Sequence, residues 1–369
     1  MLKSLSLSNF TVFPSAELTF GDHLNVLVGE NGTGKTHILK AAYAGIAVSA
    51  DYNASGTGWG QGGWGSGTWG GGKSIWTAAL AQKLVGVFRP DELGRLVTRA
   101  RGRRKSELSF HFNNEALDFS FSFSTLARSE VTLKHTPTEV IDKRPVYLPT
   151  RELLTIYPGF VSLYETSHLS FEATWRDTCV LLGAPLARGP REKRIKELLG
   201  PLETAMGGSV ELDAGGRFYL KLETGRMEMH LVAEGLRKLA TIARLIATGS
   251  LLDKGYLFWD EPESNLNPRI IKTVARVILQ LAESGIQVFI ATHSLFLLRE
   301  LHILQSQQFA GLSARYFGLE RTQSGVNVHQ GNTVDDIGSI AALDEDLQQA
   351  DRYIDTEMGL PAEASPEER

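Results

Sequence analysis

The sequence contains almost no cysteine. Cys179 is its single cysteine, so the chain cannot form an internal disulfide or a multi-cysteine zinc site, as is usual in a reducing compartment. A strong charge of either sign is also missing, because 38 basic and 42 acidic residues leave a formal net charge of -4. Contact with nucleic acid or with an anionic membrane would therefore require a local basic patch.

Long apolar runs are missing as well. No stretch approaches the roughly 20 apolar residues that a membrane helix needs, and the first residues, LKSLSLSNF, alternate apolar and polar side chains. The chain has 369 residues, 42% of them hydrophobic, which is enough for a sizeable buried core. We expect a soluble, cytoplasmic protein without a membrane contact.

Glycine, by contrast, is abundant and falls into two matches to the phosphate-loop pattern G-x-x-x-x-G-K-[ST]. The first, GENGTGKT at residues 29–36, follows an apolar, β-branched run at 23–29 and precedes a helix-like stretch at 35–48. The second, GTWGGGKS at residues 67–74, lies in a glycine and tryptophan segment at 55–72 in which no strand can form. Because a phosphate loop needs a strand before it and a helix after it, we predict that Lys35 binds phosphate and Lys73 does not.

The first match assigns roles within a nucleoside triphosphate site. Lys35 reaches the β- and γ-phosphates, and the hydroxyl of Thr36 ligates Mg²⁺. Glycines allow the backbone to approach the phosphates closely. The loop backbone predicted to surround them comprises Gly29, Glu30, Asn31, Gly32, Thr33 and Gly34.

Two further apolar runs end in residues suited to phosphate chemistry. GYLFWDEPESNLNP at 255–268 predicts a buried strand with Asp260 at its tip beside Mg²⁺ and Glu261 where it polarises an attacking water. Helix capping is the alternative for these carboxylates. IQVFIATHS at 286–294 predicts a second buried strand that ends at His293, either a γ-phosphate ligand or a structural histidine.

Ahead of these strands, LVAEGLRKLATIARLIATG at 231–249 predicts an amphipathic helix. Glu234 and Gly235 open it, and a helix N-terminus is a second potential phosphate binder.

In this order, GENGTGKT, LPTREL, VAEGLRK, LFWDEPESNLNP and IATHS resemble the motifs of ABC-type ATPases of the RecF, SMC, Rad50 and OLD group. The chain looks closest to the compact AAA/OLD-like ATPase subunits of bacterial phage-defence systems. The resemblance implies that Asn9 and Phe10 border the nucleotide, that VAEGLRK is the signature, SNLNP the D-loop and His293 the switch histidine. LPTREL takes the Q-loop position but has no glutamine, so either Arg151 or Glu152 serves there. Ala233 stands where the signature commonly has a serine.

The family implies an α/β fold: a P-loop NTPase of ABC-ATPase type with an antiparallel β subdomain and a helical subdomain between Q-loop and signature. We expect one ATPase domain at residues 1–345. Its expected parts are an N-terminal lobe (1–50 and 106–150), a Gly/Trp-rich and basic insertion (51–105), a helical and β insertion (151–230) and a signature, Walker B and His-switch lobe (231–345). Residues 346–369 are expected to form a loosely ordered acidic tail.

The spacing of the motifs separates subfamilies. About eighty residues lie between Q-loop and signature, and REKRIKELLGPLETAMG at 191–207 has no repeated heptads, so the long coiled coils of some members are excluded. We expect no Toprim nuclease domain, because such a domain needs on the order of a hundred residues and a short α/β ending follows His293. Residues 344–346, Asp-Glu-Asp, are predicted to be solvated helix surface rather than a metal pair.

Three accessory segments complete the analysis. Period-two alternation at 106–123 around Asn113 and Asn114 predicts an antiparallel hairpin. RARGRRK, Arg99 to Lys105, is a basic run expected at the end of a helix, either a solvated loop or a contact to DNA phosphates or an acidic partner. Trp59, Trp64 and Trp69 form either an aromatic patch or part of a linker.

These observations favour a Mg²⁺-dependent ATPase that assembles into at least a dimer, each ATP lying between the phosphate loop of one chain and the signature of the other. We expect it to act as a sensor or scaffold that controls a protein effector, a nuclease or toxin, in antiphage defence. The alternatives are a RecF-like repair ATPase that binds duplex DNA, and a catalytically idle ATP-binding module.

Overall fold

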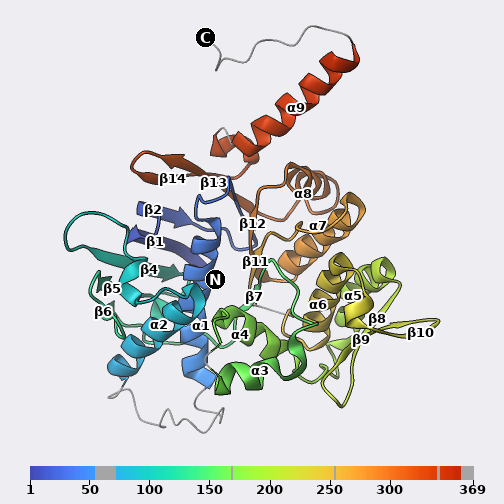
Figure 1. Cartoon of the computed structure of the whole chain (residues 1–369), viewed down its shortest axis with the longest axis horizontal. Coiled ribbons are helices and arrows are strands. Elements are labelled where there is room, and N and C mark those ends of the chain that lie inside the picture. The colour runs from blue at the N-terminus through green and yellow to red at the C-terminus, as the bar shows by residue number, and fades with distance from the viewer. Residues whose placement is uncertain (55–71, 168, 253–254, 339–340, 359–369) are drawn as a thin grey trace.

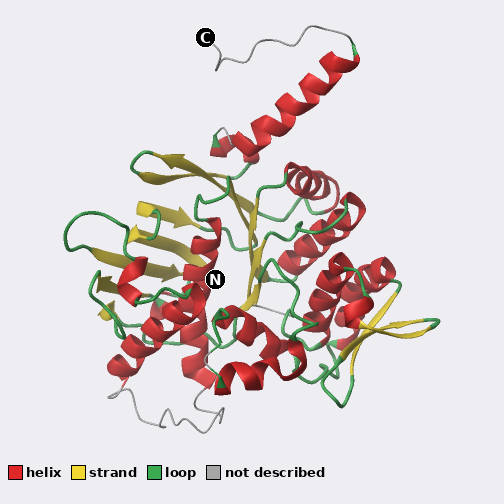
Figure 2. Cartoon of the chain, viewed as in Figure 1, coloured by secondary structure: helices red, strands yellow, loops and turns green. Residues whose placement is uncertain are grey.

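The structure is a computed structural model and describes residues 1–54, 72–167, 169–252, 255–338 and 341–358. Two sheets and the helices packed on them form its body (Figures 1 and 2). In the described part of the chain, a central six-stranded sheet has the order β14-β13-β3-β12-β11-β7, and a five-stranded antiparallel sheet has the order β2-β1-β4-β5-β6. A small antiparallel sheet, β10-β9-β8, lies on the side of the molecule opposite the five-stranded sheet (Figure 1).

The central sheet is built from the apolar runs. Its strands are β3 (Leu24–Gly29), β7 (Val146–Leu148), β11 (Gly255–Asp260), β12 (Ile286–Thr292), β13 (Ala314–Thr322) and β14 (Gly325–Gly331). Neighbouring strands are parallel except β13 and β14, which form a hairpin. Every residue of β3, β11 and β12 is buried, as expected for parallel strands covered on both faces.

The two faces of this sheet belong to two cores. On one face, Phe258 and Phe289 stack at 4.7 Å and join a core shared with α1 (Lys35–Ala54), α2 (Gly72–Phe88) and the antiparallel sheet. On the other, Leu257 and Val288 pack against α6 (Glu234–Ala247), α7 (Pro268–Glu283) and α8 (Leu295–Gln308). Helix α1 therefore lies between the two sheets and is apolar on most sides (Figure 1).

The antiparallel sheet confirms the predicted hairpin. Its strands are β1 (Leu2–Phe10), β2 (Phe13–Thr19), β4 (Lys105–Phe112), β5 (Phe119–Ser124) and β6 (Thr132–His135). Strands β4 and β5 pair around a short turn at 113–118, and their inward phenylalanines stack, with Phe110 and Phe119 4.4 Å apart.

The region between β7 and α6 is mainly helical, as predicted. It contains α3 (Tyr157–Thr166), α4 (Ala173–Leu182) and α5 (Glu192–Met206), followed by β8 (Gly208–Leu212), β9 (Phe218–Leu222) and β10 (Gly225–Glu228). Helix α5 is a single helix, so no coiled coil forms here.

Two predictions about local structure were wrong. The basic run 99–105 does not end a helix: residues 99–104 form an exposed loop that follows a one-turn 3-10 helix (Leu93–Leu96), and Lys105 is the first residue of β4. The tail expected to be loosely ordered from residue 346 onward is helical over residues 346–357, because α9 (Ala341–Glu357) includes them and extends away from the body (Figure 1). The helix predicted at residues 344–346 is thereby confirmed. The proposed domain boundaries stay a prediction. None of the described helices has the length and apolar character needed to cross a membrane.

Candidate nucleotide site

The phosphate loop lies between β3 and α1, as predicted. Gly32 and Gly34 adopt φ values of +82° and +88°, a left-handed conformation that favours glycine. A Cβ on Gly34 would lie 2.7 Å from both Val12, in the turn between β1 and β2, and Phe13, the first residue of β2. The loop is therefore held against the antiparallel sheet by contacts that only glycine permits.

Lys35 is the first residue of α1 and is buried. Its ammonium donates to the carbonyl oxygens of Gly29 at 2.7 Å and Glu30 at 2.9 Å, so the lysine folds back over the loop. Burial lowers the pKa of Lys35, and the nearby carboxylates of Glu261 and Asp260 oppose that effect. The ammonium thus lies among acidic groups at the mouth of the loop.

Thr36 and Asp260 meet although 224 positions separate them. The Thr36 hydroxyl lies 2.9 Å and 3.1 Å from the two oxygens of the Asp260 carboxylate. Burial raises the pKa of Asp260 to about 6, although the Thr36 hydrogen bond lowers it. A hydroxyl and a carboxylate are the oxygen ligands that Mg²⁺ prefers, and a single hydroxyl proton leaves most of the carboxylate lone pairs available. The donor set fits the ion.

Glu261 and His293 lie next to each other at the ends of β11 and β12. The backbone N–H of Glu261 donates to Ala291 at 2.9 Å, and Glu261 has φ +46°, an uncommon value for a residue other than glycine. Its carboxylate lies 3.4 Å from Nδ1 of His293, whose side chain is 45% exposed. The two side chains can therefore meet a ligand above the sheet.

Glu263 belongs to the same site, and the sequence analysis gave it no role. Its carboxylate is 6% exposed, accepts from the Thr292 hydroxyl at 2.6 Å and from the backbone N–H of His293 at 3.3 Å. It thereby fixes the end of β12 that carries His293. The only sequence signal was its place as the second acid after Asp260 in the DEPE run, where a surface charge is equally plausible.

The signature packs on the D-loop. Glu234 and Gly235 begin α6, and the side chain of Asn265 donates to Glu234 at 3.0 Å. Lys238, one turn later, donates to the carbonyl oxygen and the hydroxyl of Ser264. A Cβ on Gly235 would lie 3.1 Å from the carbonyl oxygen of Asn265. Signature and D-loop are therefore one packed unit.

At the Q-loop position the two candidates differ. Glu152 turns inward, accepts from the backbone N–H of Leu154 at 2.9 Å and pairs with Arg237 of α6 at 2.9 Å. Arg151 is exposed. The carboxylate of Glu152 is thus already used within the chain, whereas Arg151 faces solvent.

The β1–β2 turn borders the phosphate loop. Phe10 is fully buried and packs edge-on against Phe88 at 5.5 Å, and Asn9 donates to the carbonyl oxygen of Lys105 at 3.2 Å. Val12 and Phe13 are the side chains close to Gly34. A nucleotide contact of Asn9 or Phe10 stays a prediction.

The second phosphate-loop match ends in α2. Residues 67–71 lie outside the described residues, as do Trp59, Trp64 and Trp69. Lys73 belongs to the first turn of α2.

Two family models match the chain. A family model described as "AAA domain, putative AbiEii toxin, Type IV TA system" matches residues 24–299, and one described as "AAA domain" matches residues 4–43. Among curated proteins, the DNA replication and repair protein RecF of Macrococcus caseolyticus (strain JCSC5402) is 36% identical over 63 residues, which cover 16% of this chain and 17% of that protein. RecF of Exiguobacterium sp. (strain ATCC BAA-1283 / AT1b) is 45% identical over 42 residues, 11% of each. The match thus spans less than a fifth of either relative.

Solved structures resemble most of the chain. An SMC head bound to the C-terminal winged-helix domain of ScpA has a TM-score of 0.54 at 14% identity, over 90% of this chain and 98% of that one. An SMC head with an extended coiled coil, bound to the C-terminal domain of ScpA derived from Pyrococcus furiosus, has a TM-score of 0.51 at 11% identity, over 95% and 99%. The fold is that of an ABC-type ATPase of the RecF and SMC group.

Proposed function

Because the chain belongs to the AbiEii-type AAA family, and to the RecF and SMC group of ABC-type ATPases, we propose that it binds and hydrolyses ATP with Mg²⁺. The observation that carries this proposal is the convergence of Lys35, Thr36 and Asp260 at one edge of the central sheet. Lys35 would hold the β- and γ-phosphates, and Thr36 and Asp260 would hold Mg²⁺, which neutralises charge on the phosphates.

The hydrolytic step is assigned to the pair beside the metal ligands. Glu261 would orient and polarise the attacking water, and His293, 3.4 Å away, would contact the γ-phosphate. The partly exposed carboxylate of Glu261 argues against an idle ATP-binding module, since such a module needs no group of this kind.

We further propose that two copies enclose two nucleotides. The N-terminal turn of α6, with Glu234 and Gly235, is supported from behind by the D-loop, so it would present its backbone N–H groups to the phosphates of a second chain. In this arrangement the nucleotide state sets the contact between the chains. The assembly would then control a protein effector, a nuclease or toxin, in antiphage defence.

Two measurements test the ATPase and the dimer together. Light scattering gives the mass of the assembly, and assays of bound ATP and of released phosphate follow binding and hydrolysis. With ATP and Mg²⁺, Glu261→Gln should retain ATP and form a stable dimer, whereas Lys35→Ala should bind no ATP and stay monomeric. Glu283→Gln, on the exposed end of α7, is the matched control and should behave like the unchanged chain. Unaltered hydrolysis in Glu261→Gln or Lys35→Ala would refute the site assignment.

The effector role is tested in cells. Co-expression of the chain with the reading frames next to its gene should reduce phage plating, and Lys35→Ala should restore it while Glu283→Gln should not. Protection that survives Lys35→Ala would contradict control by nucleotide.

A second candidate function is binding of duplex DNA, as in a repair ATPase. The loop at 99–105 favours it, because Arg99, Arg101, Arg103 and Arg104 are exposed and no ion pair is recorded for them within the described residues. Glutamine at Arg101, Arg103 and Arg104 together should weaken duplex binding and reduce the salt dependence by about three phosphate contacts. Glutamine at Lys193, Arg194 and Lys196, exposed on α5, is the matched control. Absence of DNA binding at low salt would exclude this function.

A further inference from the structure

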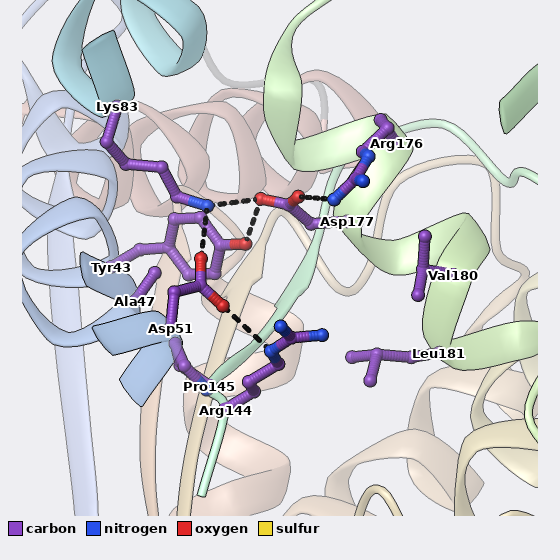
Figure 3. A pocket seen from close by; sticks show the side chains of 10 residues that line it. All are labelled: Tyr43, Ala47, Asp51, Lys83, Arg144, Pro145, Arg176, Asp177, Val180 and Leu181. Atoms are coloured by element: carbon purple, nitrogen blue, oxygen red, sulfur yellow. Dashed lines mark hydrogen bonds and ion pairs between the residues drawn. The ribbon is translucent and has the colours of Figure 1, made fainter. Parts of the chain in front are cut away.

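A small charged cleft, open to solvent, lies between α1, α2 and α4, at the end of α1 that is remote from the phosphate loop (Figure 3). Three cationic side chains converge on it from three separate elements. Lys83 comes from α2, Arg144 from the segment before β7, and Arg176 from α4. The nucleotide site described above uses none of these three side chains.

The carboxylate of Asp177 pairs with two of these cations and holds them in place. Asp177 lies 2.7 Å from the ammonium of Lys83 and 3.3 Å from Arg176, and it accepts a hydrogen bond from the Tyr43 hydroxyl at 2.7 Å. Burial acts to raise the pKa of Asp177, yet Lys83 and Tyr43 hold it below its ordinary value. Asp177 is therefore a permanent anion that orders the cleft.

The other lining carboxylate is held far more weakly. The side chain of Asp51 is 44% exposed, lies 2.7 Å from Arg144 and is 3.6 Å from Lys83, which is too long for a hydrogen bond. Exposed ion pairs of this kind contribute about 0–1 kcal/mol. Asp51 also lies near the C-terminal end of α1, where the helix dipole disfavours a negative charge. Little holds this side chain in the cleft apart from the two cations.

We propose that this cleft binds the phosphate group of a small molecule, which takes the place of the Asp51 carboxylate between Lys83 and Arg144. With Asp51 turned to solvent, the lining carries three cations and one carboxylate. Arg144 offers a planar fork that matches phosphate oxygens, and Lys83 adds a compact charge. Arg176, which also pairs with Glu165 at the rim, adds a third positive group.

The residues that line the cleft indicate which class of phosphate ligand it accepts. Val180 and Leu181 line the cleft across from Asp51 and Lys83, so an organic portion attached to the phosphate can pack there (Figure 3). The ligand is thus either inorganic phosphate or a small phosphate monoester. The inference does not depend on the assignment of ATP to Lys35.

Calorimetric titration of the full chain tests the proposal. The titrations use Lys35→Ala, so that the phosphate loop does not compete, with inorganic phosphate or glycerol phosphate as the probe. We expect saturable binding at one site. Arg144→Gln should weaken it at least about tenfold, and Asp51→Asn should tighten it by up to about tenfold, because the competing charge is gone. Lys193→Gln, on exposed α5, is the control and should change nothing.

The two probes separate the two sources. Tighter binding of glycerol phosphate supports an organic ligand, and equal binding supports phosphate itself. If Asp51→Asn shows no saturable binding up to about 10 mM of either probe, or if Arg144→Gln leaves the affinity unchanged, the charged cluster is only structural and the proposal fails. Both substitutions lie at partly exposed side chains, and circular dichroism confirms that each variant is folded.

Discussion

The carboxylate of Glu152 lies 2.9 Å from Nε of Arg237, across 85 positions of sequence, and joins the segment after β7 to the signature helix α6. Both side chains are mostly buried, at 5% and 19% exposure. The Nε–H of Arg237 forms no aligned hydrogen bond, so the contact is an ion pair. The same carboxylate accepts from the hydroxyl of Thr155 at 2.7 Å. A shift of α6 must therefore move the Q-loop segment or break this pair.

A double-mutant cycle on this pair measures the connection. Arg237→Gln should destabilise the chain by about 3 kcal/mol, because it leaves a buried carboxylate without its counter-ion. Adding Glu152→Gln should recover part of that loss, which gives a coupling of about 1–3 kcal/mol in urea unfolding. Strictly additive effects would show that the pair does not link the two segments.

Asp260 predicts how stability depends on pH in the absence of Mg²⁺. Its pKa in the folded chain is about 6, above the ordinary value of 3.8, so the folded state binds more protons than the unfolded state between these values. The free energy of unfolding therefore falls as pH rises through this window. Asp260→Asn removes the effect and should become more stable than the unchanged chain by up to about 3 kcal/mol above pH 6.

Denaturant titrations at pH 4 and pH 7 check this result. The difference between Asp260→Asn and the unchanged chain should be small at the lower pH and reach its full size at the higher one. A difference that stays the same at both would mean that Asp260 titrates normally.

Local pattern was sufficient to predict the parts of the fold that depend on neighbouring residues. The apolar runs before Gly29 and Asp260 are long enough to be buried parallel strands, and the first contains β-branched valines while the second is mostly aromatic. The glycine spacing requires a loop before α1. Lys35, Thr36 and Asp260 could be brought together from sequence because the carboxyl ends of parallel strands share one edge of a sheet.

The partners of individual charges could not be predicted in this way. Glu152 was an open candidate for the Q-loop ligand, and Glu263 was given no role. The reason is that the sequence does not show whether a glutamate is buried or exposed. What distinguishes them is a distant partner, Arg237 for the first and Thr292 for the second. Helix α9 was predicted only at residues 344–346, and its continuation was missed for another reason: its acidic composition is typical of disordered tails as well as of solvated helices.

Two substitutions of Thr36 test whether its hydroxyl is a metal ligand or only a structural group. Thr36→Val keeps the shape of the side chain but removes the hydroxyl that meets Asp260, so Mg²⁺-dependent ATP hydrolysis should fall by at least about 100-fold. Thr36→Ser is the matched control and should stay within several-fold of the unchanged chain. Equal loss in both variants would indicate a packing effect of the methyl group.

The burial of Cys179 predicts that its thiol does not react in the folded chain. It is fully buried in the core, and burial raises its pKa to about 12. Only about one molecule in ten thousand then carries a thiolate at pH 8. A chromogenic disulfide reagent should therefore label the native chain negligibly and label one thiol per chain after unfolding. Rapid labelling of the native chain would show that this part of the core opens readily.

Glu263 offers the sharpest test of how the end of β12 supports turnover. Its carboxylate holds the Thr292 hydroxyl and the backbone of His293, and neither contact involves the phosphate loop. Glu263→Ala should therefore lower kcat for ATP by about 10–100-fold with little change in KM, because His293 loses its position while nucleotide binding remains. Glu263→Gln should be milder, since a carboxamide oxygen still accepts from Thr292, and Thr292→Val should resemble Glu263→Ala. If KM rises while kcat stays constant, Glu263 acts on nucleotide binding and does not position the histidine.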